Sequence, residues 1–214
     1  MRNRFVIIDD FYTDPKGLVT HALNTKLSHQ GQGNYAGRMT TQSFLSEQHR
    51  TLFEQLTLEK PINSATDGNG RIRFSLPSDT FKQDIHFDGI GVSWSGIIYL
   101  SEQHPEVDGT IFWKHRKTNL EEIPHDLDKL QKHGLGTPQA IEALLNTDGV
   151  DKSKWQKVFT VPYRFNRLVL FRPWLFHSPG PAFGDKLENS RIVQTLFLTG
   201  QWCQVFEFLI SSLA

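Results

Sequence analysis

The stretch "NRLVLFRPWLFHSPGP", residues 166–181, passes from a turn through an apolar run to a histidine and a second turn. Valine, leucine and phenylalanine favour a buried strand, and the flanking asparagine, proline and glycine favour turns. Similar runs occur at "GRIRFSLP" (70–77), "VSWSGIIYL" (92–100), "GTIFWKH" (109–115), "WQKVFTVPY" (155–163) and "SRIVQTLFLTG" (190–200). Many short strands separated by turn residues predict a mainly β fold of the sandwich, barrel or jelly-roll type.

Helices are predicted upstream of these strands. "RFVIIDDF" is typical of a short strand, and "TDPKGLVTHALN" of a helix with Asp14 as N-cap and Pro15 at its first position. A second helix is predicted from near Ser43, with apolar residues at roughly helical spacing until Pro61. The N-terminal strand and helices therefore occupy about residues 1–69.

A polar segment interrupts the strands at about residues 115–154. Weak helical periodicity around Leu127–Lys132 and Pro138–Leu145 indicates that this insertion is partly helical. We expect an inserted lid or surface excursion between two strands. The chain length suits one domain of α+β class, residues 1–214, with its β core at about residues 70–200.

The composition narrows the class of partner. The chain has 23 Lys and Arg against 23 Asp and Glu, so its formal net charge is zero. A neutral chain offers no basic surface for nucleic acid and no cationic face for a membrane, which leaves a small-molecule or peptide substrate. The only cysteine, Cys203, cannot form an internal disulfide, and Asp9 and Asp10 interrupt any apolar region of a signal peptide. We therefore expect a cytoplasmic protein with no membrane span.

The motif "HFD" supplies two candidate metal ligands. Successive strand residues point to opposite faces, so His86 and Asp88 emerge together and Phe87 points away. With nine histidines and 23 acids in the chain, such a pair also arises by chance, and it suits an exposed turn. His177 ends the quoted stretch; alone it is compatible with a structural histidine. Two histidines and one carboxylate, however, make the facial triad of non-haem Fe(II) oxygenases, which leaves positions open for other ligands.

Arg191 begins the last predicted strand and shares one face with Val193 and Thr195. An oxoacid that chelates iron needs a cation for its distal carboxylate, and the planar guanidinium is the best-matched partner. An arginine at a strand edge also suits simple solvation. The order of the three elements along the chain, more than any one of them, favours a metal site.

Taken together, "HFD", "IIYL", "GTIFWKH", "NRLVLFRPWLFHSPGP" and "RIVQTLFL" resemble the catalytic core of the Fe(II)/2-oxoglutarate-dependent dioxygenases, closest to the prolyl 4-hydroxylase-like branch. The resemblance covers roughly residues 70–200 and implies a double-stranded β-helix, a jelly-roll core with the metal at its open mouth. It implies that His86, Asp88 and His177 are the iron ligands and, with Arg191, the catalytic residues.

The resemblance also implies a cosubstrate site. Arg191 matches the basic residue that holds the distal carboxylate of 2-oxoglutarate, and Thr195 matches a weaker polar position. Tyr99 matches a strand tyrosine that often hydrogen-bonds the same carboxylate, although an aromatic at an interface suits this position equally well. The implied reaction uses Fe(II), 2-oxoglutarate and O2, hydroxylates a C–H bond and releases succinate and CO2. Ascorbate is a further reductant that the resemblance admits.

The sequence indicates the substrate less clearly than the metal site. Where the family commonly has a glycine pair, this chain has Asp108–Gly109, which puts the subfamily and its substrate in doubt more than the metal. Arg73 lies on the strand before His86 and could present its guanidinium to the mouth of the core. Trp94 and Trp113 lie on neighbouring strands and could stack on a substrate, although core packing is the favoured role for both.

Two other classes of function stay open. A non-catalytic, cupin-like jelly-roll binding module would retain the strands but would need no arginine on the last strand. A Zn-dependent hydrolase could use the same two histidines and carboxylate, with an additional general base. Binding of both a metal and 2-oxoglutarate would separate the oxygenase from these alternatives.

Overall fold

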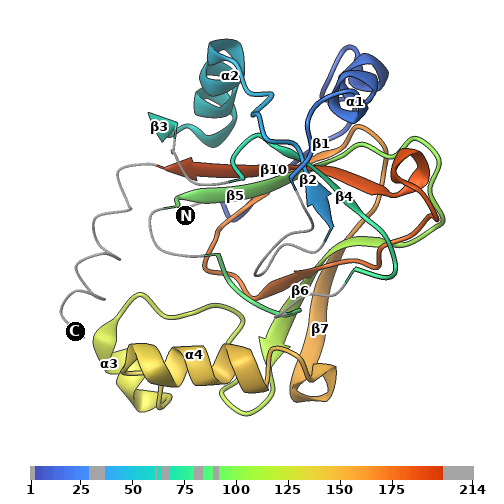
Figure 1. Ribbon diagram of the computed structural model, residues 1–214. Helices are drawn as coiled ribbons and strands as arrows, with labels where there is room; N and C mark the ends of the chain where they lie inside the picture. Colours follow the sequence, from blue (N-terminus) through green and yellow to red (C-terminus); the bar gives the residue numbers. More distant parts are fainter. Residues whose placement is uncertain are drawn as a thin grey trace.

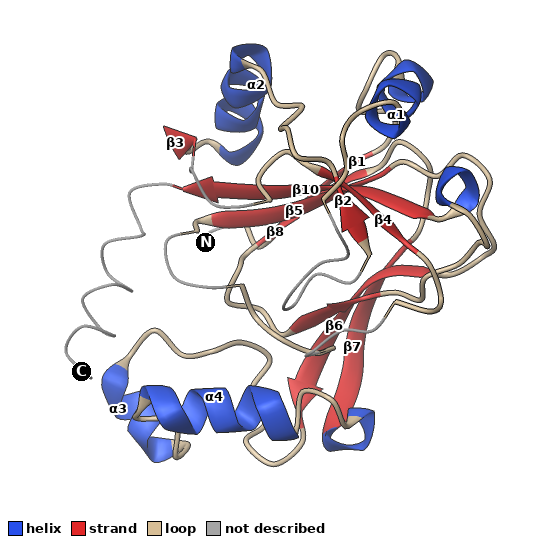
Figure 2. Ribbon diagram, viewed as in Figure 1, coloured by secondary structure: helices blue, strands red, loops and turns tan. Residues whose placement is uncertain are grey.

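The computed structural model describes residues 3–28, 37–60, 62–63, 68–79, 84–88 and 92–199; Cys203 lies outside these ranges. Within them, two antiparallel sheets face each other, with helices outside (Figure 1). The larger sheet has the order β1 (Phe5–Ile8), β8 (Leu168–Phe171), β5 (Trp94–Tyr99), β10 (Arg191–Thr199), β4 (Ile72–Ser75) and β2 (Arg38–Met39), and β3 (Ile62–Asn63) also pairs with β10. The smaller sheet has the order β7 (Trp155–Pro162), β6 (Asp108–His115) and β9 (His177–Pro179). The fold is mainly antiparallel β with a few helices, as predicted (Figure 2).

Strand β10 lies inside the larger sheet and has two buried faces. It pairs with β5 in the register Thr195↔Ile97 and with β4 in the register Gln194↔Ile72. Side chains alternate across a sheet, so Ile192 and its even-numbered neighbours pack toward the helices. Odd-numbered residues such as Val193 pack toward the smaller sheet. The space between the sheets is therefore lined by one face of each.

Helices α1 (Pro15–Leu23) and α2 (Glu47–Thr57) cover the outer face of the larger sheet (Figure 1). Asp14 caps α1 as predicted, because its Oδ1 accepts a hydrogen bond from the Gly17 amide at 2.9 Å. The predicted start of α2 near Ser43 is too early. Among the described residues, no helix has the length and apolar character needed to cross a lipid bilayer.

The start of α2 is set by a local cap. The Ser46 amide donates to Nδ1 of His49 at 3.0 Å, so one of the amides that a helix start leaves without a partner is bonded at this point. Leu58 follows the helix with φ of 56°, and this left-handed residue ends it before Pro61 is reached. The apolar periodicity of the sequence therefore extends beyond the helix on both sides.

The polar insertion lies between β6 and β7 and contains α3 (Leu127–Lys132), α4 (Pro138–Thr147) and the short η1 (Lys152–Lys154); η2 (Leu187–Asn189) precedes β10. Both helices occur where the periodicity indicates them. Asp126 and Thr137 cap α3 and α4 through their side-chain oxygens. Apolar insertion residues, Leu130 and Leu144 among them, pack into one cluster with Ile111, Trp113, Trp155 and Phe176. The insertion is thus fastened to the smaller sheet by a core of its own.

Candidate metal centre

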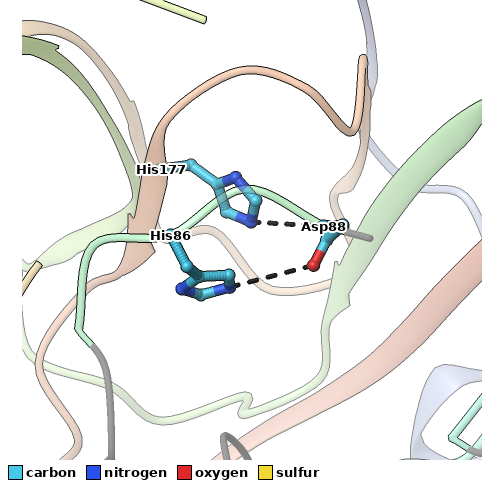
Figure 3. A group of neighbouring side chains, drawn as sticks. All are labelled: His86, Asp88 and His177. Carbon is cyan, nitrogen blue, oxygen red and sulfur yellow. Dashed lines mark ion pairs between the residues drawn. The ribbon is translucent and has the colours of Figure 1, made fainter. Parts of the chain in front are cut away.

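His86, Asp88 and His177 converge in a pocket between the two sheets (Figure 3). Each offers one ligand atom, and these atoms all lie within 4.8 Å of one another. Nε2 of His86 lies 3.8 Å from Oδ1 of Asp88, and Nε2 of His177 lies 3.5 Å from Oδ2. Two imidazole nitrogens and a carboxylate oxygen facing one point are a suitable donor set for Fe(II) or Zn(II).

Backbone hydrogen bonds fix the spacing of these ligands. The His86 amide donates to the His177 carbonyl at 2.9 Å, and the His177 amide donates back to the His86 carbonyl at 2.8 Å. This reciprocal pair places the two imidazole centroids 4.5 Å apart. The Asp88 amide donates to the Pro173 carbonyl at 2.8 Å, so the carboxylate is also held against the segment before His177. The site is built on main-chain bonds rather than on side chains alone.

The tautomers of both histidines are set for metal binding. Nδ1 of His86 lies 3.0 Å from the Asp84 carbonyl, and Nδ1 of His177 lies 2.8 Å from the Leu175 carbonyl. A carbonyl oxygen can only accept, so each Nδ1 carries the hydrogen and each Nε2 keeps its lone pair. Burial, opposed in part by the Asp88 carboxylate, lowers the pKa of His177 to about 4. The His177 imidazole is therefore neutral at neutral pH, as a metal ligand must be.

Arg191 lines the same pocket from the first position of β10, and its side chain is 2% exposed. Its Nη2 donates to the Gly109 carbonyl at 2.9 Å, whereas its Nε has no hydrogen-bond partner among the described residues. No carboxylate of the described chain forms an ion pair with it. Burial lowers the pKa of the guanidinium, and the phenols of Tyr163 and Tyr99 partly oppose this shift. An arginine nevertheless stays charged, so Arg191 is a buried cation for which the described residues supply no counterion.

Tyr99 and Thr195 are the other two residues predicted to contact the cosubstrate, and both lie in the region of Arg191. The Tyr99 hydroxyl lies 2.7 Å from Oγ1 of Thr110, and burial raises the pKa of Tyr99 to about 12, so it is neutral. Tyr99 itself does not line the pocket; Thr110, its partner, does. Thr195 lines the pocket and donates to the Gly68 carbonyl at 2.6 Å. Tyr99 is thus placed behind the pocket wall, and Thr110 is the residue that sequence reasoning missed.

A family model described as "Family of unknown function (DUF6445)" matches residues 1–190. The chain belongs to the DUF6445 family. No curated protein sequence matches it. Neither comparison names an activity, so the resemblance to a dioxygenase core is tested against solved structures.

Three solved structures resemble this DUF6445 protein. A prolyl hydroxylase from Trichoplax adhaerens, in complex with a hypoxia inducible factor peptide fragment, aligns with TM-score 0.53 at 15% identity, over 94% of this chain and 86% of that one. A Pseudomonas putida prolyl-4-hydroxylase gives 0.49 at 14% identity over 92% of both chains. The Fe(II)/(alpha)ketoglutarate-dependent dioxygenase TqaL gives 0.46 at 11% identity over 94% and 85%. At these identities the first likeness shows a shared fold, and the other two scores are too low to carry an argument.

Of the three residues predicted to contact a substrate, the DUF6445 chain places one in the pocket and two outside its lining. Arg73 lines the pocket and is 6% exposed. Trp94 and Trp113 do not line it and pack in the core, which is the role that the sequence favoured for both. Trp94 faces the helices, and Trp113 packs in the insertion's cluster with its Nε1 donating to Ser178 at 2.9 Å. Each tryptophan points away from the pocket because its pocket-facing neighbours, Ser95 and Thr110 among them, occupy alternate positions.

The insertion of this DUF6445 protein lies away from the lining of the candidate pocket. All of residues 115–154 are described, and none of them lines the pocket. The insertion instead contacts the segments that carry the metal ligands from behind. The Ile85 amide donates to the Gly149 carbonyl at 2.9 Å, next to His86, and the Phe176 amide donates to the Glu121 carbonyl at 3.0 Å, next to His177. The insertion therefore braces the two histidine-bearing segments.

Gly109 is a further residue whose role was not predicted from the sequence. A Cβ at this position would lie 2.5 Å from the Tyr99 hydroxyl, so only glycine leaves room for the tyrosine. Its carbonyl is also the acceptor for Arg191. The available signal was the departure from the family's glycine pair, and the structure places Asp108 and Gly109 at the start of β6.

Proposed function

We propose that this chain is an Fe(II)- and 2-oxoglutarate-dependent oxygenase that hydroxylates a C–H bond of a small-molecule or peptide substrate. One observation carries the proposal: a buried arginine, with no carboxylate partner in the part of the chain that the structure describes, opens on the same pocket as a two-histidine, one-carboxylate cluster. Either feature alone suits several functions. Together they provide a metal and a cation for the two ends of a dicarboxylic oxoacid.

The fold is consistent with this proposal. Two facing antiparallel sheets with the candidate site between them are the arrangement expected of a double-stranded β-helix. The Trichoplax prolyl hydroxylase shares the fold and is named for a complex with a peptide. Fold likeness at this identity is an analogy. It supports the class of activity and does not indicate the substrate. A peptide and a small molecule are therefore both retained as substrate classes.

The donor set fits Fe(II) and its cosubstrate. When bound, iron and 2-oxoglutarate would supply, with O2, the oxidising chemistry that ends in succinate, CO2 and a hydroxylated substrate. Hydrogen bonds from Nδ1 of His86 and His177 keep both Nε2 lone pairs directed at the metal position. Arg191 would bind the distal carboxylate, and the Gly109 carbonyl would hold the guanidinium in place. Tyr99 would act through Thr110 rather than by direct contact.

Calorimetric titration tests the proposal directly. The apoprotein is loaded anaerobically with Fe(II) and titrated with 2-oxoglutarate, and succinate is then measured after exposure to air. We expect one tight 2-oxoglutarate site that requires the metal. Arg191→Met should weaken 2-oxoglutarate binding by at least about 30-fold and leave Fe(II) affinity unchanged, because a buried charge pair is lost.

The controls separate the alternative functions. Arg50→Met changes an arginine whose side chain is 41% exposed, and it should leave both affinities unaltered. Asp88→Ala should abolish metal binding and, with it, 2-oxoglutarate binding. A wild-type protein that binds metal but no 2-oxoglutarate would refute the oxygenase and favour a zinc hydrolase. A protein that binds neither would favour a binding module.

A further inference from the structure

Each candidate histidine ligand is oriented by a carbonyl group two residues before it. Nδ1 of His86 lies 3.0 Å from the Asp84 carbonyl, and Nδ1 of His177 lies 2.8 Å from the Leu175 carbonyl. In metal sites such partners fix the tautomer and the direction of the ring, and their loss weakens metal binding by about 10–100-fold. Whatever holds these two carbonyls in place therefore also holds the metal position.

The start of the insertion holds the Leu175 carbonyl. Glu122 and Leu175 form an isolated antiparallel bridge. Two main-chain hydrogen bonds flank this bridge, from the Phe176 amide to the Glu121 carbonyl at 3.0 Å and from the Ile123 amide to the Trp174 carbonyl at 2.9 Å. The segment that presents the acceptor of His177 is thus paired with the insertion on both sides of Leu175.

The end of the insertion holds the Asp84 carbonyl. Nζ of Lys152 lies 2.7 Å from Oδ2 of Asp84, and the Ile85 amide donates to the Gly149 carbonyl at 2.9 Å. One ion pair and one main-chain bond therefore fix the two residues that precede His86. The insertion contacts the acceptor segments of both histidines, although it is remote from both in sequence.

The end of the insertion is itself firmly anchored. Oδ2 of Asp148 lies 3.0 Å from Nε2 of His115, a side chain that is 1% exposed, and the Asp148 carbonyl accepts from Nε1 of Trp155 at 2.8 Å. A Cβ on Gly149 would lie 2.6 Å from the Ile85 carbonyl oxygen, so this close approach of two main chains requires glycine. The anchored end can therefore act as a rigid support for His86.

We propose that the insertion positions both histidine ligands and thereby sets the affinity of the metal centre, with Gly149 and Lys152 as positioning residues for His86. This inference rests on the metal-binding part of the proposed function and not on the cosubstrate. Rings that are oriented before the metal arrives lose less conformational freedom on binding, so the affinity is higher. An insertion that served only as additional core would stabilise the fold without affecting the metal.

Two glycine variants of the insertion separate these roles. The apoprotein is titrated with Co(II) under nitrogen, without 2-oxoglutarate, and its stability is measured by urea denaturation without metal. Gly149→Ala should weaken Co(II) binding by at least about tenfold, because the new methyl group forces Gly149 and Ile85 apart. Gly134→Ala is the matched control. This position has φ of 72° and no atom within 4 Å of an added Cβ, so the variant should lose stability but keep its Co(II) affinity within about twofold.

The visible absorption of bound Co(II) gives a second measurement, because it depends on the geometry of the ligands. We expect the spectrum to change in Gly149→Ala and to be unaltered in Gly134→Ala. A loss of stability alone would not move the spectrum of the metal-bound protein. The spectrum therefore reports the orientation of the ligands separately from the stability of the fold.

The ion pair provides a test that tolerates poor folding of Gly149→Ala. Lys152→Met should weaken Co(II) binding by up to about fivefold, because the pair is partly exposed. The exchanged pair, Asp84→Lys with Lys152→Asp, should restore most of the affinity. Lys157→Met is the control, since it breaks a comparably exposed pair with Asp108, at 2.8 Å, that does not involve a ligand segment.

Two outcomes would overturn the inference. One is a Co(II) affinity that neither Gly149→Ala nor Lys152→Met changes. The other is an equal loss of affinity in each variant and its control, which would mean that reduced stability alone weakens the site. Failure of the wild-type protein to bind Co(II) is a different result, because it would refute the metal centre and the proposed function together. Binding of Co(II) without binding of 2-oxoglutarate would refute the oxygenase and leave the role of the insertion intact.

Discussion

Two arginines of this chain, Arg172 and Arg191, are equally buried and have opposite surroundings. Each side chain is 2% exposed. Arg172 follows β8, where its guanidinium pairs with Glu59 at 2.6 Å, donates to the Ser93 carbonyl at 3.1 Å and lies 3.9 Å from the Trp94 ring. Arg191 donates to one carbonyl and keeps its Nε without a partner among the described residues.

The difference teaches that burial of a charge is no sign of function in itself. Glu59 and the carbonyls offset the cost of removing the Arg172 charge from water, so this network joins the end of α2 to the larger sheet. Arg191 retains that cost in the absence of a ligand. A folded protein keeps such a group where a ligand supplies the missing anion. A missing counterion, rather than burial, distinguishes the candidate binding residue.

The largest predicted effect on stability follows from replacing Arg172, the buried arginine that has a counterion. Arg172→Met should lower the free energy of unfolding by about 3–5 kcal/mol, because it leaves the partly buried Glu59 carboxylate without its cation. Arg191→Met, at the same burial, should change it by less than about 1 kcal/mol, because relief of the desolvation cost offsets the lost packing. Urea denaturation of the three proteins, without ligand, measures both values. Equal destabilisation by the two substitutions would contradict the comparison.

A smaller effect is expected from the neutral groups around Arg191. Tyr99→Phe removes one hydrogen bond, to Thr110, and should cost roughly 0.5–1.5 kcal/mol of stability. It should weaken 2-oxoglutarate binding by less than about tenfold, since Tyr99 acts through Thr110 rather than on the ligand. Denaturation and calorimetry provide the two numbers. If Tyr99→Phe lowered the free energy of unfolding as much as Arg172→Met, the neutral hydrogen bonds near Arg191 would be as stabilising as the Arg172–Glu59 ion pair, and the comparison would fail.

The smallest effect concerns a third arginine, at the surface. Arg167 binds Asp9 with Nε–Oδ1 at 2.5 Å, and this hydrogen bond lowers the pKa of the Asp9 carboxyl below its usual 3.8. A lowered pKa stabilises the fold above about pH 4, and the stabilisation is lost as pH falls through the folded-state pKa. The pair is partly exposed, so Asp9→Asn should cost less than about 1 kcal/mol at neutral pH.

Acid denaturation checks this sign. The stability difference between the wild-type protein and Asp9→Asn should shrink as the pH is lowered from 6 to 3 (roughly the range in which the carboxylate titrates). Arg164 also pairs with Asp9, at 2.8 Å, so Arg164→Gln should reproduce part of the change. A difference that grew at low pH would mean that Asp9 is stabilised in its protonated form instead.

The sequence alone determined most of the elements and the order of the site residues. Asp14 and Pro15 specified the start of α1, and turn residues separated the predicted strands, because caps and turns depend on local chemistry. His86, Asp88, His177 and Arg191 were selected as residue types able to hold a metal and an anion. Residue type alone indicates this chemistry, since the capacity to ligate a metal is a property of the side chain.

Only the tertiary structure decided which way side chains point and what surrounds them. Both faces of β8 and β10 are buried, so these two strands lack the strict polar alternation that would reveal the pocket face. The His86–His177 backbone pair and the brace formed by the insertion join segments that are far apart in the chain. Which acidic side chains lie near Arg191 also depends on how distant segments pack. Such long-range contacts are set by packing, which no local pattern of residues records.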